Sequence, residues 1–129
     1  MKITFISRHE LTPAQEATLQ AMGYTEWERR EILFEHPVQQ MRQMGLREGE
    51  DVAIVAPLWV GVELLNAGYE IVEFRNQPSA RAKGVFLCLG ATRMRFAGGA
   101  FSRRILSKFY FCPIPWQEQE AVPVAAVQA

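Results

Sequence analysis

The chain has few cysteines and no hydrophobic run long enough to cross a membrane. Its two cysteines, Cys88 and Cys112, lie in apolar stretches and do not have the spacing of metal ligands. A membrane-spanning helix needs about 18 consecutive apolar residues, and no stretch approaches that length. We find no signal peptide pattern either. These absences predict a cytoplasmic protein with two reduced thiols and no membrane partner.

The sequence also lacks the patterns of the commonest cofactor and nucleophile sites. It contains only two histidines, His9 and His36, without a third clustered ligand, so no metal site is expected. No G-x-G-x-x-G follows the first predicted strand, and there is no Walker-type G-K-[ST]. No serine lies in a nucleophile elbow. Classical dinucleotide and nucleoside triphosphate binding are therefore disfavoured, and no cofactor is expected.

Acidic residues are missing from one long segment, although the formal net charge of the chain is zero. Residues 1–74 carry six Lys and Arg against twelve acids, whereas residues 75–111 carry eight Lys and Arg and no acid. Interleaved aromatics make this basic segment suitable for an anionic partner such as RNA or a nucleotide. Alternatively, its arginines neutralise the acidic half or line a dimer interface. The candidate nucleic-acid contacts are Arg93, Arg95, Arg103, Arg104 and Lys108.

Strand and helix patterns alternate over the first 74 residues. Short apolar runs typical of strands occupy residues 2–6, 31–34, 51–56 and 69–74. Helix patterns, two with proline in the first turn and all ending near a glycine, occupy residues 13–22, 37–45 and 58–67. This order predicts an α/β fold with a Rossmann-like parallel sheet of about four strands and flanking helices.

The pattern changes after Pro78. Apolar runs at 84–89 and 105–112, with 92–96 as an extension or a further strand, predict a C-terminal antiparallel β-hairpin or meander. It would extend the parallel sheet. We therefore expect one α/β domain over residues 1–116 and a disordered tail over residues 117–129.

Polar side chains follow each predicted parallel strand. Ligands of open α/β sheets bind outside the carboxyl ends of the strands, so these segments should meet at one binding edge. The first strand continues into Ser7-Arg8-His9-Glu10 and then into a helix start with Thr12 as N-cap. The further candidate ligand-binding residues at this edge are His36, Trp59, Arg75 and Asn76.

Residue types suggest the chemistry of this edge. His9 could act as a general acid or base, and Arg8 could clamp a phosphate. Ser7 and Thr12 could donate to a phosphate beside the helix N-terminus, where the helix dipole favours anions. The plainer interpretations are a turn-supporting His9, an ion pair of Arg8 with an acid such as Glu10, and a simple N-cap at Thr12.

Trp59 and His36, which are expected at the same edge, each have a functional and a plainer interpretation. Trp59 could stack on a base or simply pack as an aromatic. His36 precedes Pro37 and is either a ligand contact or an ordinary loop residue.

The N-terminal motif resembles a known family. A strand that runs into His-x-Leu-Thr-x-x-Gln, here His9, Leu11, Thr12 and Gln15, is similar to several small CRISPR-associated proteins with a Rossmann-like fold. Some of them are linked to binding or cleaving cyclic oligoadenylate messengers. The resemblance covers about fifteen residues and a compatible strand–helix order to about residue 75. The arginine-rich segment does not match that pattern.

The leading hypothesis is therefore a homodimer that binds or processes an anionic nucleotide, such as a cyclic oligoadenylate, without a metal. The 2′-OH of an adenylate would attack its neighbouring phosphate, with Arg8 and His9 as the catalytic residues and Ser7 assisting. The alternative is a non-enzymatic nucleic-acid-binding or oligomeric accessory protein of a mobile element or defence system.

Overall fold

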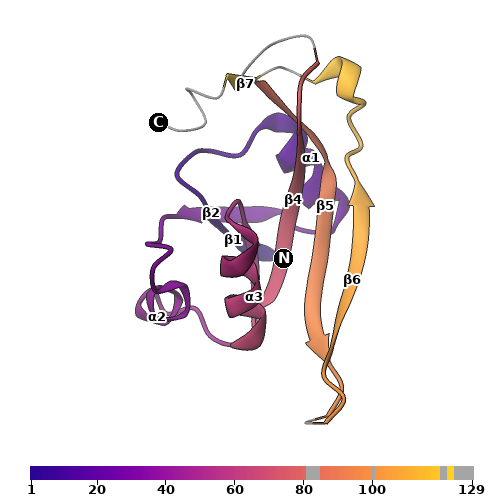
Figure 1. Cartoon of the computed structure of the whole chain (residues 1–129). Coiled ribbons are helices and arrows are strands. Elements are labelled where there is room, and N and C mark those ends of the chain that lie inside the picture. Colours follow the sequence, from indigo (N-terminus) through magenta and orange to yellow (C-terminus); the bar gives the residue numbers. More distant parts are fainter. Residues whose placement is uncertain (81–84, 100, 120–121, 124–129) are drawn as a thin grey trace.

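The computed structural model describes residues 1–80, 85–99, 101–119 and 122–123 (Figure 1). The strands are β1 (Lys2–Ile6), β2 (Glu26–Arg30), β3 (Asp51–Ile54), β4 (Glu70–Pro78), β5 (Val85–Ala97), β6 (Arg104–Phe111) and β7 (Val122–Pro123). The helices are α1 (Pro13–Ala21), α2 (Pro37–Gln43), α3 (Leu58–Asn66) and a 3₁₀ turn, η1 (Trp116–Glu118). The prediction of an α/β fold is confirmed.

One sheet contains the strands in the order β2-β1-β3-β4-β5-β6, and β7 pairs with β5. The four strands β2, β1, β3 and β4 run parallel, whereas β5 is antiparallel to both β4 and β6. The sheet thus has a parallel N-terminal half and an antiparallel C-terminal half, as predicted. No helix in the described part of the chain is long and apolar enough to span a membrane.

Successive side chains of the parallel strands point to opposite faces, and each face is covered by different helices. On one face, Phe5 of β1 packs in a buried cluster with Leu19 of α1. On the other face, Ile54 of β3 packs with Met41 of α2 and Leu64 of α3. Because strand side chains alternate, burial on both faces requires helices on both sides of the sheet.

The start of α1 follows the local sequence closely. The Thr12 Oγ1 accepts from the Gln15 backbone N–H at 3.2 Å, and the Gln15 Oε1 accepts from the Thr12 N–H at 3.0 Å. This reciprocal pair is a capping box, with Pro13 at the first helical position. It fixes the point at which the loop after β1 becomes helix.

The position of β2 corrects the sequence prediction. The second strand is Glu26–Arg30, whereas the sequence pattern placed it at residues 31–34. Among the described strands β2 is an edge strand that pairs only with β1, and for this reason most of its residues are polar and partly or fully exposed. The apolar residues that follow do not form a strand, and Leu33 is 61% exposed.

β4 and β5 are both longer than the sequence patterns predicted. β4 extends to Pro78, because β5 pairs with it from Ile71↔Met94 to Pro78↔Phe86. The prediction that Arg75 and Asn76 follow the end of the strand is therefore wrong. The two runs predicted around 84–89 and 92–96 form one strand, although residue 84 itself lies outside the described residues.

A β-bulge interrupts the β4–β5 pairing. Arg75 pairs with Gly90, but Asn76 pairs with Cys88, so Leu89 is the extra residue. Gly90 has a φ of +146°, and a Cβ there would overlap the carbonyl oxygen of Tyr110. Only glycine suits this position, and the extra residue of the bulge lies in β5.

The C-terminal segment returns to β5. After β6, η1 leads to Gln119, whose side chain bonds to the backbone of Cys88. Val122 then pairs with Phe86 in the short β7–β5 ladder. Residues 120–121 and 124–129 of the expected disordered tail lie outside the described residues.

Candidate functional site

A cavity of about 210 Å³ lies at the carboxyl end of the parallel strands. Its lining comes from the loop after β1, the start of α1, the residue after β3, the end of β4 and the start of β5. The lining residues are His9, Thr12, Gln15, Val55, Asn76, Phe86 and Cys88. Three of the predicted ligand or catalytic residues, His9, Thr12 and Asn76, are thus brought together.

Part of the cavity wall is apolar. Val55 and Phe86 contribute hydrocarbon and aromatic surface, and Phe86 is 39% exposed. Cys88 is buried, and this burial raises the pKa of its thiol to about 11. Because the thiol stays protonated near neutral pH, Cys88 is a wall residue and not a nucleophile.

Amide groups supply the polar part of the lining. Gln15 uses its Oε1 for the capping box, while its Nε2 has no hydrogen-bond partner within the described ranges. The side chain of Asn76 is exposed and likewise makes no hydrogen bond to any described residue. The cavity therefore offers one free amide donor from Gln15 and both a donor and an acceptor from Asn76.

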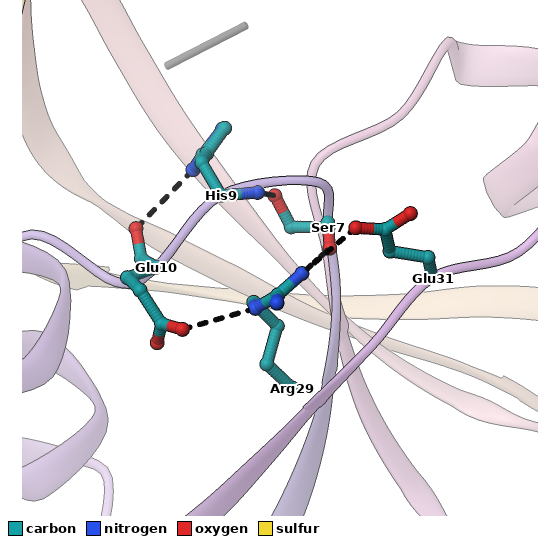
Figure 2. Close-up of polar contacts among 5 residues, drawn as sticks. All are labelled: Ser7, His9, Glu10, Arg29 and Glu31. Carbon is teal, nitrogen blue, oxygen red and sulfur yellow. Dashed lines mark hydrogen bonds and ion pairs between the residues drawn. The ribbon is translucent and has the colours of Figure 1, made fainter. Parts of the chain in front are cut away.

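His9 lines the cavity and contacts two neighbouring residues of its own loop. Its Nδ1 is 3.2 Å from the carbonyl oxygen of Glu10, and its backbone N–H donates to the Ser7 Oγ at 3.2 Å (Figure 2). Because a carbonyl can only accept, this contact is a hydrogen bond in the tautomer with the proton on Nδ1, and in that tautomer Nε2 has a free lone pair. This nitrogen can act as a general base.

Arg29 of β2 holds the loop that carries His9. Its guanidinium donates to the Glu10 carboxylate at 3.1 Å, to the Glu31 carboxylate at 3.0 Å and to the Ser7 carbonyl at 3.2 Å (Figure 2). The hydrogen bonds to Glu31 and Glu10 raise the pKa of Arg29 further above its usual value. The sequence pattern did not indicate Arg29, because it predicted the second strand at residues 31–34 and not at Glu26–Arg30.

These contacts change the interpretation of two predicted ligand residues. Ser7 is buried; its hydroxyl accepts from His9 within the loop, and its carbonyl accepts from Arg29 of β2. Glu10 pairs with Arg29 and not with Arg8. Neither Ser7 nor Glu10 lines the cavity; they support the loop that does. Arg8 is exposed and has no ion pair among the residues the structure describes.

The remaining predicted edge residues lie elsewhere. His36 lines a separate open groove together with Glu35, Arg42 and Glu63. Trp59 is 48% exposed on α3 and is not part of the cavity lining. Arg75 donates to the Thr92 Oγ1 at 3.1 Å and to Glu73 at 3.3 Å. These hydrogen bonds hold Arg75 against two neighbouring residues of its own sheet.

Two of the five basic candidates pair with acids of the first 74 residues. Arg93 contacts Asp51 at 3.3 Å and also donates to the Tyr24 hydroxyl, and Arg95 lies 4.0 Å from Glu70. Burial, reinforced by the hydrogen bond to Asp51, raises the pKa of Tyr24 to about 12. These contacts lie at the amino ends of β3 and β4, away from the cavity.

The other three basic candidates contact aromatic rings or solvent. Arg103 lies over the Phe96 ring at 4.6 Å, and Lys108 lies over the Tyr110 ring at 5.0 Å. Arg104 is exposed. None of these three has an acidic partner in the described part of the chain, so their charges remain available.

Comparisons with known proteins give no match: neither a family model nor a curated protein nor a solved structure matches the chain. Among the described residues, no group of three or more His, Cys, Asp or Glu side chains could hold a metal ion. The cavity and the loop of residues 7–10 are therefore the features that bear on function.

Proposed function

We propose that the cavity and the adjoining loop of residues 7–10 bind an anionic nucleotide and promote its metal-independent processing in a Rossmann-like fold. A cyclic oligoadenylate is the candidate ligand, on the resemblance of the N-terminal motif. The observation that carries the proposal is that His9 and Thr12, from the segment between β1 and α1, and Asn76, from β4, line one cavity. The cavity lies where open α/β sheets bind ligands.

The cavity suits a planar base. Phe86 supplies an aromatic surface on which a base can stack, and Val55 adds apolar contact. The edge of a purine presents both hydrogen-bond donors and acceptors, which the free amide groups of Asn76 and Gln15 can match. An unmatched donor or acceptor would cost binding energy, so these amides would select among bases.

The loop suits the phosphate. Arg8 is exposed and unpaired in the described part of the chain, and it is adjacent in sequence to His9. A guanidinium binds phosphate oxygens in a bidentate manner. Because α1 begins just after this loop, the positive end of its dipole also favours an anion there. Arg8 would neutralise charge on the phosphoryl oxygens in the transition state.

The proposed reaction needs no metal and no water. His9 Nε2 takes the proton of a ribose 2′-OH, and the 2′-oxygen forms a bond to the adjacent phosphorus. The bond from phosphorus to the 5′-oxygen breaks, that oxygen takes a proton from the solvent, and His9 releases the proton of the 2′-OH to the solvent. The products are a 2′,3′-cyclic phosphate and a free 5′-OH. The protein supplies orientation, the base and charge stabilisation.

The test is a nucleotide screen followed by turnover measurements in the presence of EDTA. A ligand at a hundred times its Kd should stabilise the fold by about 2.7 kcal/mol, which thermal melts detect. With cyclic tetra-adenylate, His9→Ala should lower turnover by roughly 10²–10⁴-fold. His36→Ala is the matched control, because His36 lines a different groove. Unchanged turnover in both Arg8→Ala and His9→Ala would exclude this site.

A second candidate function is nucleic-acid binding without catalysis. It is favoured by the three basic side chains that lack acidic partners among the described residues, Arg103, Arg104 and Lys108. Such binding should weaken steeply with salt, because each neutralised phosphate releases counterions. The double charge reversal Arg103→Glu with Arg104→Glu should abolish it. Affinity for RNA that is unaffected by this double substitution would exclude the candidate.

A further inference from the structure

Within the described part of the chain, β6 lies at the end of the sheet and pairs on one side only. The strand order ends at β6, and β5 is its neighbour. Figure 1 shows β6 at the border of the sheet opposite to β2. Its eight residues contain no proline, and its register with β5 has no shift. An unpaired strand edge of this length is a template for another strand.

The hydrogen bonds to β5 define which backbone groups of β6 are free. The Cys112 N–H donates to the Leu89 carbonyl at 2.9 Å, just beyond the pair Gly90↔Phe111. In an antiparallel ladder the residues that bond to the neighbour alternate. The even-numbered residues of β6 therefore bond to β5, and Ile105, Ser107, Phe109 and Phe111 direct their backbone N–H and C=O groups to the free edge.

The side chains of these odd-numbered residues are exposed and largely apolar. Ile105 is 47% exposed, Phe109 is 38% exposed and Phe111 is 80% exposed. Phe109 and Phe111 pack edge to face, with ring centroids 4.9 Å apart. Three large apolar side chains on one side of an edge strand favour an intermolecular contact.

We propose that β6 pairs antiparallel with β6 of a second copy of this chain, about a two-fold axis at Ser107. The two sheets would then form one continuous sheet. The β6–β6 pairing defines the surface and the strand register of the dimer, and it does not depend on nucleotide binding.

The charges of β6 select this register. A two-fold axis at Leu106 would place Arg104 opposite Lys108 of the second copy, and an axis at Lys108 would place the two Lys108 side chains opposite each other. Like charges in directly opposite positions are destabilising. Axes at Ile105 or Phe109 avoid this repulsion but pair fewer residues of the strand. The axis at Ser107 avoids it and uses nearly the whole strand.

Two kinds of opposite pair in this register are complementary. Ile105 faces Phe109 of the second copy, which is an aliphatic–aromatic pair. Arg104 faces Tyr110 of the second copy, where a cation–π contact can form. Lys108 faces Leu106 of the second copy. Because Lys108 and Arg104 of the second copy remain diagonal neighbours, salt should strengthen the dimer by screening them. Nucleic-acid binding has the opposite salt dependence.

The first experiment measures the mass of the protein by sedimentation or light scattering without nucleotide. We expect twice the chain mass of 14.7 kDa, with tighter association at higher salt. Ser107→Pro should give monomers, because it removes the N–H at the centre of the interface while that N–H is not needed by β5. Ser107→Thr keeps the N–H and should stay dimeric. A single-chain mass at every concentration up to the solubility limit would overturn the proposal.

A second experiment tests the register. In a hydrogen-bonded antiparallel pair the two opposite Cα atoms lie about 5.5 Å apart, which a disulfide can span. In the proposed register, position 107 of one copy lies opposite position 107 of the other, so Ser107→Cys places two cysteines at this distance. Mild oxidation should therefore crosslink the two copies through position 107. Ser102→Cys is a control of the same chemistry on the preceding turn and should not crosslink. A dimer that persists in Ser107→Pro, or that does not crosslink in Ser107→Cys, would place the interface elsewhere and overturn the proposal.

Discussion

The side-chain amide of Gln119 pairs with both backbone groups of Cys88. The Cys88 N–H donates to the Gln119 Oε1 at 2.8 Å, and the Gln119 Nε2 donates to the Cys88 carbonyl at 2.7 Å. The Gln119 side chain thus makes the two hydrogen bonds that a neighbouring strand would make at this point of β5. Because Cys88 lines the cavity, this contact fixes one wall of the candidate site from the C-terminal segment.

Gln119→Ala should destabilise the fold by about 1–3 kcal/mol, since two backbone groups of Cys88 lose their partner in a partly buried position. Urea unfolding followed by circular dichroism measures this difference. Gln117→Ala is the control, because Gln117 is exposed and should change the free energy of unfolding by less than about 0.5 kcal/mol. Equal effects of the two substitutions would contradict the role of Gln119.

Gly90→Ala should be one of the most damaging single substitutions in the chain. The added Cβ would overlap the Tyr110 carbonyl oxygen, and φ of +146° disfavours any other residue. We expect a loss of more than about 3 kcal/mol in the free energy of unfolding. Gly99→Ala is the matched control, because among the described residues other than its chain neighbours no atom lies within 4 Å of the position of its Cβ. Thermal melts of the two variants would show the difference directly.

The buried phenol of Tyr24 should make stability depend on alkaline pH. Its pKa is raised from the ordinary value of 10 to about 12 in the folded state, first by burial and then by the hydrogen bond to Asp51. The folded state therefore holds the proton more tightly than the unfolded chain. This stabilisation is complete below pH 10 and is lost as the pH rises from 10 through 12. Two pKa units correspond to about 2.7 kcal/mol.

Urea unfolding of the wild type and of Tyr24→Phe between pH 8 and 11 tests this expectation. The Cys88 thiol also has a raised pKa, of about 11, but it is present in both proteins and its contribution cancels in the difference. The stability advantage of the wild type should begin to shrink above pH 10. A difference that stays constant over this range would show that Tyr24 is not responsible.

Arg29 should control the order of the His9 loop. It donates to the Ser7 carbonyl and to the carboxylates of Glu10 and Glu31, so Arg29→Ala removes three contacts at once. Hydrogen exchange of the backbone amides at residues 8–10 should become faster, while exchange in β3 stays unchanged. Under the proposed function, turnover should fall as well, because Nε2 of His9 loses its fixed position. Arg30→Ala is the control, since Arg30 pairs with Glu28.

The sequence by itself determined the local features of this protein. The apolar runs of β1 and β3 and the capping box of Thr12 and Gln15 are encoded by residues close together in the chain. The same local pattern placed His9 and Thr12 at the carboxyl edge of the sheet. Strand, cap and turn signals of this kind require no distant partner, so they can be read directly.

Only the tertiary structure decided which polar residues face the cavity. β2 has no apolar pattern because it is an edge strand. The sequence therefore predicted the second strand at the wrong residues and did not indicate that Arg29 belongs to the site. The bulge at Gly90 and the pairing of β4 with β5 brought Asn76, Phe86 and Cys88 to His9. Pairing between strands depends on contacts across many residues of separation, which composition and periodicity do not encode. The choice of Asp51 and Glu70 as the partners of Arg93 and Arg95 likewise depends on how the strands pair.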